Sequence, residues 1–171
     1  DVNVEIINNF PPSIMENIKK QLQKSEEQIT MDDLNKIKSL HITENMNIDS
    51  IVSVMKNIES ISIHVPIDDW AFLNKIPELK ELTISGNDLE DLSFLKSLDK
   101  LEKLHVDRNN LKSLEGIEHL NKLQYLYAGQ NQLNNLEPLQ DLDSLVMVEL
   151  YDNHITSLKP IQNLNQLEYL K

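Results

Sequence analysis

His105 and Asp107 have the residue types and the spacing that come closest to a chemical site in this chain of 171 residues. If they lie on a strand, side chains two residues apart point to the same side, so an imidazole and a carboxylate would meet. Such a pair can contribute to a metal site or respond to protonation. A metal site needs a third ligand, and Glu149 is expected two strands away, roughly 10 Å by strand spacing. We expect no metal and no other cofactor, while an interface that responds to pH stays open.

The other chemistry-bearing residues do not form a catalytic constellation. The chain has no cysteine, and glycine occurs only at Gly86, Gly116 and Gly129, so a phosphate-binding loop is not encoded. The serines lack a nucleophile-elbow context such as G-x-S-x-G. Carboxylate pairs such as Glu90 with Asp91 are typical of solvated loops. We therefore expect no enzyme activity in this segment.

The pattern that organises the chain is a tandem repeat of 21 or 22 residues. Aliphatic residues begin the repeats at Ile37, Ile58, Leu79, Leu101, Leu123, Leu145 and Leu167. We refer to these repeats as coils 1 to 7. Within a coil, aliphatics recur at positions 1, 4, 6, 11, 14, 17 and 20, as from Leu101 to Leu120.

This spacing fits neither one helix nor one strand. Positions 4 and 6 alternate as in a short strand, whereas positions 11 to 20 recur every third residue, which is typical of a 3₁₀ or extended segment. A single coil cannot bury its aliphatics, so neighbouring coils must supply the other walls. The sequence predicts an α/β solenoid with a parallel sheet on one side, with Trp70 as a core residue at position 14 of coil 2.

An asparagine at position 9 follows most of the predicted strands. Where the chain turns after a strand, its backbone groups lose their strand partners, and an amide side chain can both donate to and accept from them. We expect a buried structural ladder of amides, one per coil, rather than a ligand site. Coil 2 is one residue short and has Pro66 at this position, so its turn must differ. The ladder residues are Asn45, Asn87, Asn109, Asn131 and Asn153.

Positions 3, 5 and 7 of each strand are expected to point outward together, opposite to the core. We call them the outward columns. Position 3 is Ser39, Ser60, Glu81, Lys103, Tyr125, Met147 and Tyr169; position 5 is His41, Ser62, Thr83, His105, Tyr127, Glu149 and Lys171; position 7 is Thr43, His64, Ser85, Asp107, Gly129 and Tyr151.

All four tyrosines of the chain fall in the outward columns. Tyr125, Tyr127, Tyr151 and Tyr169 gather on neighbouring coils with Met147, and Gly129 is expected to leave a gap beside them. Exposed aromatic and methionine clusters are typical of protein-binding centres. The alternative is that these residues only stabilise the sheet through cross-strand pairs, because tyrosine favours strands in any case.

Further residues of the same face complete the predicted binding site. Arg108, the only arginine, lies at position 8 on the rim, where it could anchor a partner or form an ordinary ion pair with a surface carboxylate. His105, Asp107 and Glu149 are included because they share the outward columns. His119 and His154 are expected on outer loops, facing solvent.

Composition limits the partners. Sixteen basic and 28 acidic residues give a net charge of −12, which repels phosphate backbones and favours a basic partner surface. No apolar run approaches the roughly 18 residues of a membrane span. We expect no nucleic-acid binding and no membrane insertion, and we expect a monomer. Without cysteine, stability depends on burial rather than on disulfides.

The N-terminal 36 residues are expected to cover the first coil. Residues 1–9 alternate weakly and predict a short strand or linker. Ile14, Ile18 and Leu22 form one helical face after Pro11 and Pro12. Thr30, followed by Asp33, predicts a capping box that opens a second helix continuing through Ile37.

Both ends of the chain suggest that it is part of a longer protein. It starts without Met, and it stops five residues into the coil that begins at Leu167. We expect upstream sequence, and further repeats or a capping domain downstream, because a solenoid needs a polar end cap.

Here the pattern reaches a family. The blocks from Leu79, Leu101, Leu123 and Leu145 resemble the 22-residue leucine-rich repeat LxxLxLxxNxLxxLxxLxxLxx, and Pro138 and Pro160 at position 16 are similar to the bacterial internalins. The segment NNFPPSIMENIKKQLQKSEEQITMDDLNKIKSL is similar to the internalin cap. The departures are the two 21-residue coils and Phe72 and Phe94 at position 16.

This resemblance implies a right-handed leucine-rich repeat superhelix with a concave sheet, and a virulence- or adhesion-related protein of a Gram-positive bacterium. It implies a secreted or cell-wall-associated protein, with its signal peptide and anchor outside this segment, that binds a host or extracellular protein through its concave face. Two alternatives stay open. One is an intracellular scaffold resembling the leucine-rich repeat regulator of protein phosphatase 1, and the other is a spacer beside a haem- or ferritin-binding domain.

Overall fold

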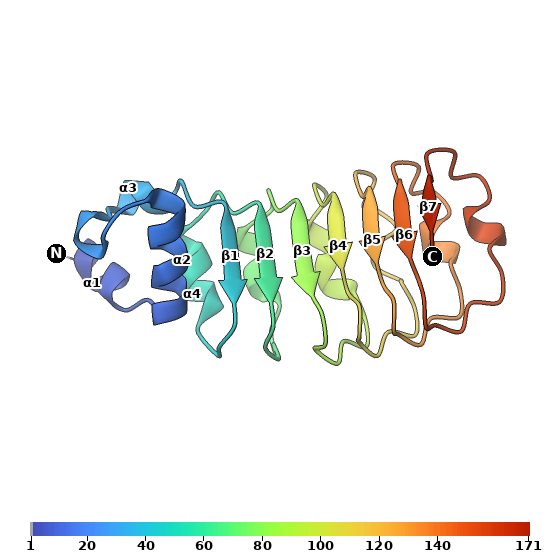
Figure 1. Cartoon of the computed structure of the whole chain (residues 1–171), viewed down its shortest axis with the longest axis horizontal. Helices are drawn as coiled ribbons and strands as arrows, with labels where there is room; N and C mark the ends of the chain where they lie inside the picture. Colours follow the sequence, from blue (N-terminus) through green and yellow to red (C-terminus); the bar gives the residue numbers. More distant parts are fainter. Residues whose placement is uncertain (1) are drawn as a thin grey trace.

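The computed structural model describes residues 2–171 as an elongated stack of coils behind an N-terminal group of helices (Figure 1). Seven parallel strands lie in one sheet in chain order. Position 3 of each coil pairs with position 3 of the next in all six strand pairs, from Ser39 with Ser60 to Met147 with Tyr169. The strands are β1 (Ser39–Ile42), β2 (Ser60–Ile63), β3 (Glu81–Ile84), β4 (Lys103–His105), β5 (Tyr125–Tyr127), β6 (Met147–Glu149) and β7 (Tyr169–Leu170).

The aliphatic positions form one continuous core inside the stack. Leu104, Leu126 and Val148, at position 4 of successive coils, are all fully buried. Each buried leucine contributes about 2 kcal/mol relative to an exposed one, and a leucine of one coil is covered mainly by its equivalents in the coils above and below. The predicted solenoid and its side-chain directions are confirmed.

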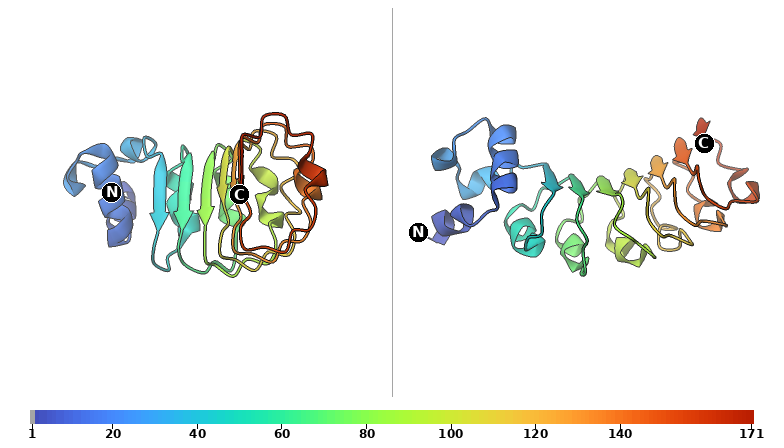
Figure 2. Two further views of the ribbon diagram at one scale, coloured as in Figure 1. Left: turned by 45° about the vertical axis from the view of Figure 1, so that its right-hand side comes forward. Right: turned by 60° about the horizontal axis from the view of Figure 1, so that its bottom comes forward.

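The returning side of each coil lies behind the sheet, on the outer side of a shallow arc (Figure 2). Coil 4 returns through bends and turns between Leu111 and Leu120. The other regular coils use a short 3₁₀ helix, as the three-residue spacing predicts. These are η2 (Ala71–Lys75), η3 (Ser93–Ser97), η4 (Glu137–Leu139) and η5 (Lys159–Ile161).

Coil 1 departs from this prediction, because it returns through an α-helix, α4 (Ile48–Val54). The side-chain amide of Asn47 accepts a hydrogen bond from the Ser50 N–H at 3.1 Å and caps the helix. Ile48, Ile51, Val52 and Met55 are buried at helical spacing, with exposed fractions of 5%, 2%, 0% and 0%. This helical spacing was the sequence signal that an alignment on the regular coils overlooked.

Trp70 is core only in part. It stands at position 14 of coil 2, where regular coils have leucine, and its indole is half-buried. The ring stacks on Phe94 of the next coil with centroids 4.5 Å apart and an interplanar angle of 16°. An indole is too large for a site dimensioned for leucine, so it lies against the neighbouring coil at the convex surface.

The N-terminal cap contains α1 (Val2–Asn8), α2 (Pro12–Leu22), η1 (Glu26–Gln28) and α3 (Met31–Leu34). The strand or linker predicted for residues 1–9 is wrong for residues 2–8, which are helical, with Ile7 buried in the cap. The second predicted helix starts at its capping box but ends at Leu34, not at Ile37. Ile37 already belongs to coil 1, and the chain must extend there to enter β1.

Helix α2 also closes the outer edge of the sheet. Gln21 accepts hydrogen bonds from the N–H groups of Lys38 and Ser39 at 3.1 and 3.2 Å and donates to the Ser39 carbonyl at 2.7 Å. These groups would otherwise be an open strand edge, which invites pairing with other chains. No helix between residues 2 and 171 is long and apolar enough to cross a bilayer.

Asp33 is the electrostatic centre of the cap. Its carboxylate is only 2% exposed and forms ion pairs with Lys24 at 2.7 Å and Lys36 at 2.8 Å. It also accepts hydrogen bonds from the Thr30 N–H at 3.1 Å and the Thr30 hydroxyl at 3.0 Å. Hydrogen bonds from the two lysines, then from Thr30, hold the pKa of Asp33 far below its ordinary value.

We expect Asp33→Asn to lower the melting temperature at pH 7 by several degrees and to flatten its decline in acid. Because the folded pKa is depressed, the stabilisation is complete above the unfolded pKa of about 3.9 and is lost as pH falls below it. Melting curves from pH 7 to pH 3 would show the gap between parent and variant closing. The control is Asp32→Asn, an exposed neighbour; equal effects of both substitutions would contradict this role for Asp33.

The asparagines at position 9 join successive coils by a repeated pattern. The Asn109 amide donates to the Ile84 carbonyl of the preceding coil at 2.8 Å and accepts from the N–H groups of Asn87 and Leu89 at 2.9 and 3.1 Å. Asn131 likewise donates to the Val106 carbonyl at 2.9 Å and accepts from the Leu111 N–H at 3.1 Å. The equivalent bonds of Asn153 go to Ala128 and Leu133 at 2.9 Å each. Asn109 and Asn131 are each 6% exposed.

Asn45 does not follow this pattern, and the expectation that it is buried is wrong. Each amide of the ladder bonds to the coil before it. Coil 1 has no earlier coil, because the cap helix α2 occupies that side. The side chain of Asn45 is therefore exposed.

Candidate protein-binding face

The outward columns lie on the side of the sheet that faces the viewer in Figure 1, opposite to the returning segments. Along the strands, burial alternates as the sequence predicts: Leu126 is fully buried, whereas Tyr125 and Tyr127 on either side of it are partly exposed. Parallel pairing in register then stacks equivalent residues of neighbouring coils. Tyr125 is aligned with Met147, and Met147 with Tyr169.

These columns bring five side chains together across β5, β6 and β7, in a cluster that we call the aromatic platform. Tyr169 is its most open member, with 43% of its surface exposed, and the other four are half-buried. Half-buried rings are held in place by their neighbours but keep one accessible surface, which favours contact with a partner. The platform consists of Tyr125, Tyr127, Met147, Tyr151 and Tyr169.

His105 extends the platform onto β4. Its imidazole stacks on the Tyr127 ring with centroids 4.0 Å apart and an interplanar angle of 4°. Burial lowers the pKa of His105, although the nearby Asp107 carboxylate, with 4.0 Å between Nδ1 and Oδ2, raises it. The neutral imidazole therefore predominates at pH 7, and the stack presents a flat, uncharged surface.

Gly129 does not leave the gap that the sequence predicted. A Cβ atom at this position would lie 2.4 to 2.7 Å from ring atoms of Tyr151, so the phenol ring already fills the space above Gly129. The ammonium group of Lys171 lies 4.8 Å from the centroid of this ring. Glycine is needed here because any side chain would push Tyr151 off the sheet.

Lysines flank the platform, and the sequence analysis did not include them. Lys171 lies over Tyr151, and the Lys103 ammonium lies 5.5 Å from the centroid of the Tyr125 ring. Such cation–π contacts hold a ring in one orientation. Their signal in the sequence was their place in the outward columns, one strand away from a tyrosine.

The remaining predicted residues lie at the border of the platform. Glu149 is aligned with Tyr127 in the strand register and is half-buried. Arg108 is exposed at the turn after β4, with a φ of 54°, and takes part in none of the ion pairs formed within residues 2–171. The alternative of an ordinary surface ion pair is therefore wrong, and the guanidinium stays available to a partner.

Charge is sparse on this face compared with the rest of the chain. The outward columns hold three acidic and two basic side chains, a net charge of −1, whereas the chain carries −12. The excess acidic charge therefore lies on the cap, the turns and the convex side. A nearly neutral centre surrounded by charge is the pattern of protein interfaces.

The other histidines do not build a second site. His41 Nδ1 lies 2.6 Å from the Ser62 hydroxyl across β1 and β2, on the open sheet. His119 is half-buried, 3.7 Å from Asp99, and not fully solvent-facing as predicted; His154 is exposed. Over residues 2–171, no group of three or more histidine, cysteine or carboxylate side chains could hold a metal ion.

Comparisons with known proteins agree with this architecture. A family model described as Leucine Rich repeats (2 copies) matches residues 77–119. No curated protein sequence matches the chain.

Solved structures extend the likeness to the whole chain. An internalin (inlF) of Listeria monocytogenes superposes with a TM-score of 0.77 at 23% identity, over 98% of this chain and 58% of that one. An internalin C2 of the same species superposes with a TM-score of 0.67 at 25% identity, over 97% and 95% of the two chains. A leucine-rich repeat protein of Leptospira interrogans gives a TM-score of 0.65 at 25% identity, over 80% and 38%.

The two internalins match this chain over both the helical cap and the coils, and the family model matches the repeats themselves. The chain spans 58% of the length of the first internalin and nearly all of the second. The repeat pitch, the parallel sheet, the cap and these matches together show that the chain is a leucine-rich repeat protein of the internalin type.

Proposed function

We propose that this protein-interaction module binds a host or extracellular protein with the aromatic platform, as part of a bacterial surface or secreted protein. The observation that carries the proposal is the continuous run of half-buried rings on β5 to β7, extended onto β4 by the His105–Tyr127 stack. The surface location is inferred from the likeness to internalins of Listeria monocytogenes.

The platform has the features of an energetic centre of binding. Tyrosine combines a large apolar ring with a polar tip and has few side-chain torsions to immobilise, so it adds contact area at low entropic cost. The rings are already held by stacking, by Gly129 and by lysines, so binding has little side-chain order left to impose. The rim residues Asp107, Arg108 and Glu149 then supply direction and specificity.

The charge distribution indicates what kind of surface fits. Because the outward columns are nearly neutral, the centre of the partner is expected to be apolar or uncharged. The acidic residues of the turns and cap favour basic groups at the partner's periphery. Such groups accelerate association at low salt more than they strengthen the complex.

We expect the triple variant Tyr125→Ser, Tyr127→Ser and Tyr151→Ser to lose partner capture, because truncating central aromatic anchors typically costs about 2 kcal/mol or more each. Its melting temperature should stay within a few degrees of the parent, since the rings are partly exposed. The measurement is capture of extracellular proteins from a host-cell surface preparation by the immobilised chain, with bound proteins identified by mass spectrometry.

The matched control replaces three exposed residues of the convex side, Lys96→Ser, Asp141→Ser and Asn163→Ser. This variant should retain every protein that the parent retains. A protein captured equally by the parent, the control and the tyrosine variant would show that the platform is not the binding centre.

A further inference from the structure

The amide ladder is interrupted between coils 1 and 2. In regular coils a position 9 amide accepts N–H groups from the coil before it, as Asn109 does from Asn87 and Leu89. The equivalent N–H groups of coil 1 belong to Asn45 and Asn47, and coil 2 faces them with Pro66. Proline has no amide side chain, so it cannot accept these two hydrogen bonds.

The effect of Pro66 is visible on both sides of coil 2. Among the hydrogen bonds formed within residues 2–171, none uses the N–H of Asn45 or Asn47 as donor. On the other side, Asn87 donates to the Ile63 carbonyl at 3.1 Å, but its Oδ1 is buried without a partner. The proline N–H that could have served as donor does not exist.

The turns of coils 1 and 2 also lack the backbone bonds that join later turns. Gly86, Arg108 and Gln130 donate to carbonyls of the next coil at 3.2, 3.0 and 2.8 Å. No such bond joins Glu44 to coil 2 within the described residues. The two turns therefore stand apart.

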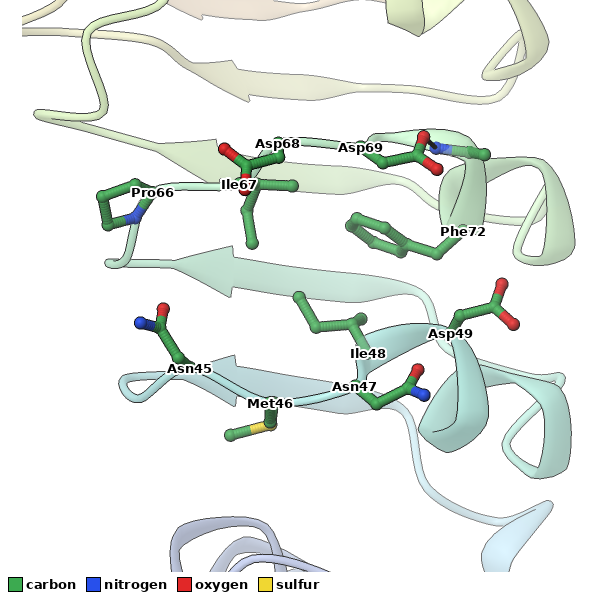
Figure 3. A pocket seen from close by; sticks show the side chains of 11 residues that line it. Asn45, Met46, Asn47, Ile48, Asp49, Pro66, Ile67, Asp68, Asp69 and Phe72 are labelled. Atoms are coloured by element: carbon green, nitrogen blue, oxygen red, sulfur yellow. Dashed lines mark hydrogen bonds between the residues drawn. The ribbon is translucent and has the colours of Figure 1, made fainter.

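A groove of about 480 Å³ lies between these two turns. Figure 3 shows Asn45, Met46 and Asn47 on the β1 side, Pro66 to Asp69 on the β2 side, and Ile48 and Phe72 between them. The groove thus combines an apolar floor, two free N–H donors on one wall and carboxylates on the other. It lies beyond the ends of the strands, outside the aromatic platform.

We propose that this groove binds a primary carboxamide, the side chain of an asparagine or glutamine on a partner peptide segment, in the manner of the ladder amides. The oxygen of the carboxamide accepts from the N–H groups of Asn45 and Asn47. Its NH₂ group donates toward Asp68, whose carboxylate forms no hydrogen bond within residues 2–171. The four asparagines of the later coils show that this fold holds such a group with one acceptor and several donors.

The charges of the groove select against other side chains. Asp49 is paired with Lys75 at 2.7 Å, and Asp69 accepts from the Ala71 N–H at 2.8 Å, but both stay ionised beside Asp68. A ligand carboxylate would be repelled by these groups, and an ammonium group could not accept from the two N–H donors. A neutral carboxamide meets both requirements.

The test is a titration of the ¹⁵N-labelled chain, followed by amide chemical shifts, with three capped pentapeptides of alanine whose central residue is asparagine, aspartate or leucine. The peptides end in an N-methyl amide so that only the central side chain differs in kind. The asparagine peptide should cause saturable shifts at Asn45, Asn47 and Ile67, and the other two should not. Equal shifts with the leucine peptide would overturn the proposal in favour of a merely apolar groove, and absence of shifts at these residues would overturn it outright.

Two variants locate the donors. Asn45→Ala removes the side chain but keeps the N–H, and it should bind the asparagine peptide as the parent does. Asn45→Pro removes the N–H, and it should weaken binding about tenfold, the effect of losing one hydrogen bond worth roughly 1.4 kcal/mol. Equal affinity of the two variants would contradict the assignment; if Asn45→Pro fails to fold, the shift map of the parent decides. Because the aromatic platform is intact in both variants, this result is independent of the proposed protein-binding face.

Discussion

Leu114→Asp is expected to abolish cooperative folding of the coils. Leu114 is fully buried in coil 4, in the middle of the stack. An aspartate there is an unpaired charge without hydrogen-bond partners, and it also leaves a cavity, which together cost about 4 kcal/mol or more. Since domains are stable by only about 5 to 15 kcal/mol in total, most of that margin is lost. Thermal unfolding followed by circular dichroism should shift by tens of degrees or lose its sharp transition.

The matched control is Lys112→Asp in the same coil, two residues earlier and exposed. It introduces the same side chain without burying it, so its melting curve should stay close to that of the parent. If Leu114→Asp melted like this control, the inward direction of position 14 would be wrong, and the outward columns would have to be assigned again.

Asn131→Ala is expected to have the second largest effect, a loss of about 2 to 4 kcal/mol in the free energy of unfolding. The Asn131 amide donates to the carbonyls of Val106, Ala128 and Gly129 at 2.9, 3.2 and 3.2 Å and accepts from the Leu111 N–H at 3.1 Å. Alanine leaves these backbone groups buried without a partner, in a site too enclosed for easy hydration. Denaturant unfolding monitored by circular dichroism measures the loss.

Asn45→Ala is the control for the ladder, because Asn45 holds the same repeat position but is exposed and has no preceding coil. It should change the free energy of unfolding by less than about 0.5 kcal/mol. A similar loss at both positions would mean that the effect comes from the turn conformation and not from bonds between coils.

The identity of the fold was accessible from the sequence because each regular coil has the same environment. A leucine at position 4 or 14 meets the equivalent leucines of its neighbours, so period and composition determine which side chains point inward. The same reasoning predicted that Tyr125 and Tyr127 flank a buried Leu126. It works best in the middle of the stack.

At the N-terminal end this reasoning fails, because the environment there is not repeated. Residues 2–8 form a helix, coil 1 returns through α4, and Asn45 is exposed. In each case the neighbour is the cap and not another coil, so the repeat pattern carries no information about the contact. Only the helical spacing of Ile48, Ile51, Val52 and Met55 could have indicated α4 in advance.

The sequence by itself determined the pitch of the coils, the inside and outside of the sheet, and the set of residues on the outward face. Only the tertiary structure decided how those residues meet: the stacking of His105 on Tyr127, the Tyr151 ring over Gly129, and the groove that Pro66 opens between two turns. The physical reason is that residue spacing fixes the direction of a side chain. Its rotamer and contacts, however, depend on neighbours about 22 residues away, which touch it only when the coils are stacked.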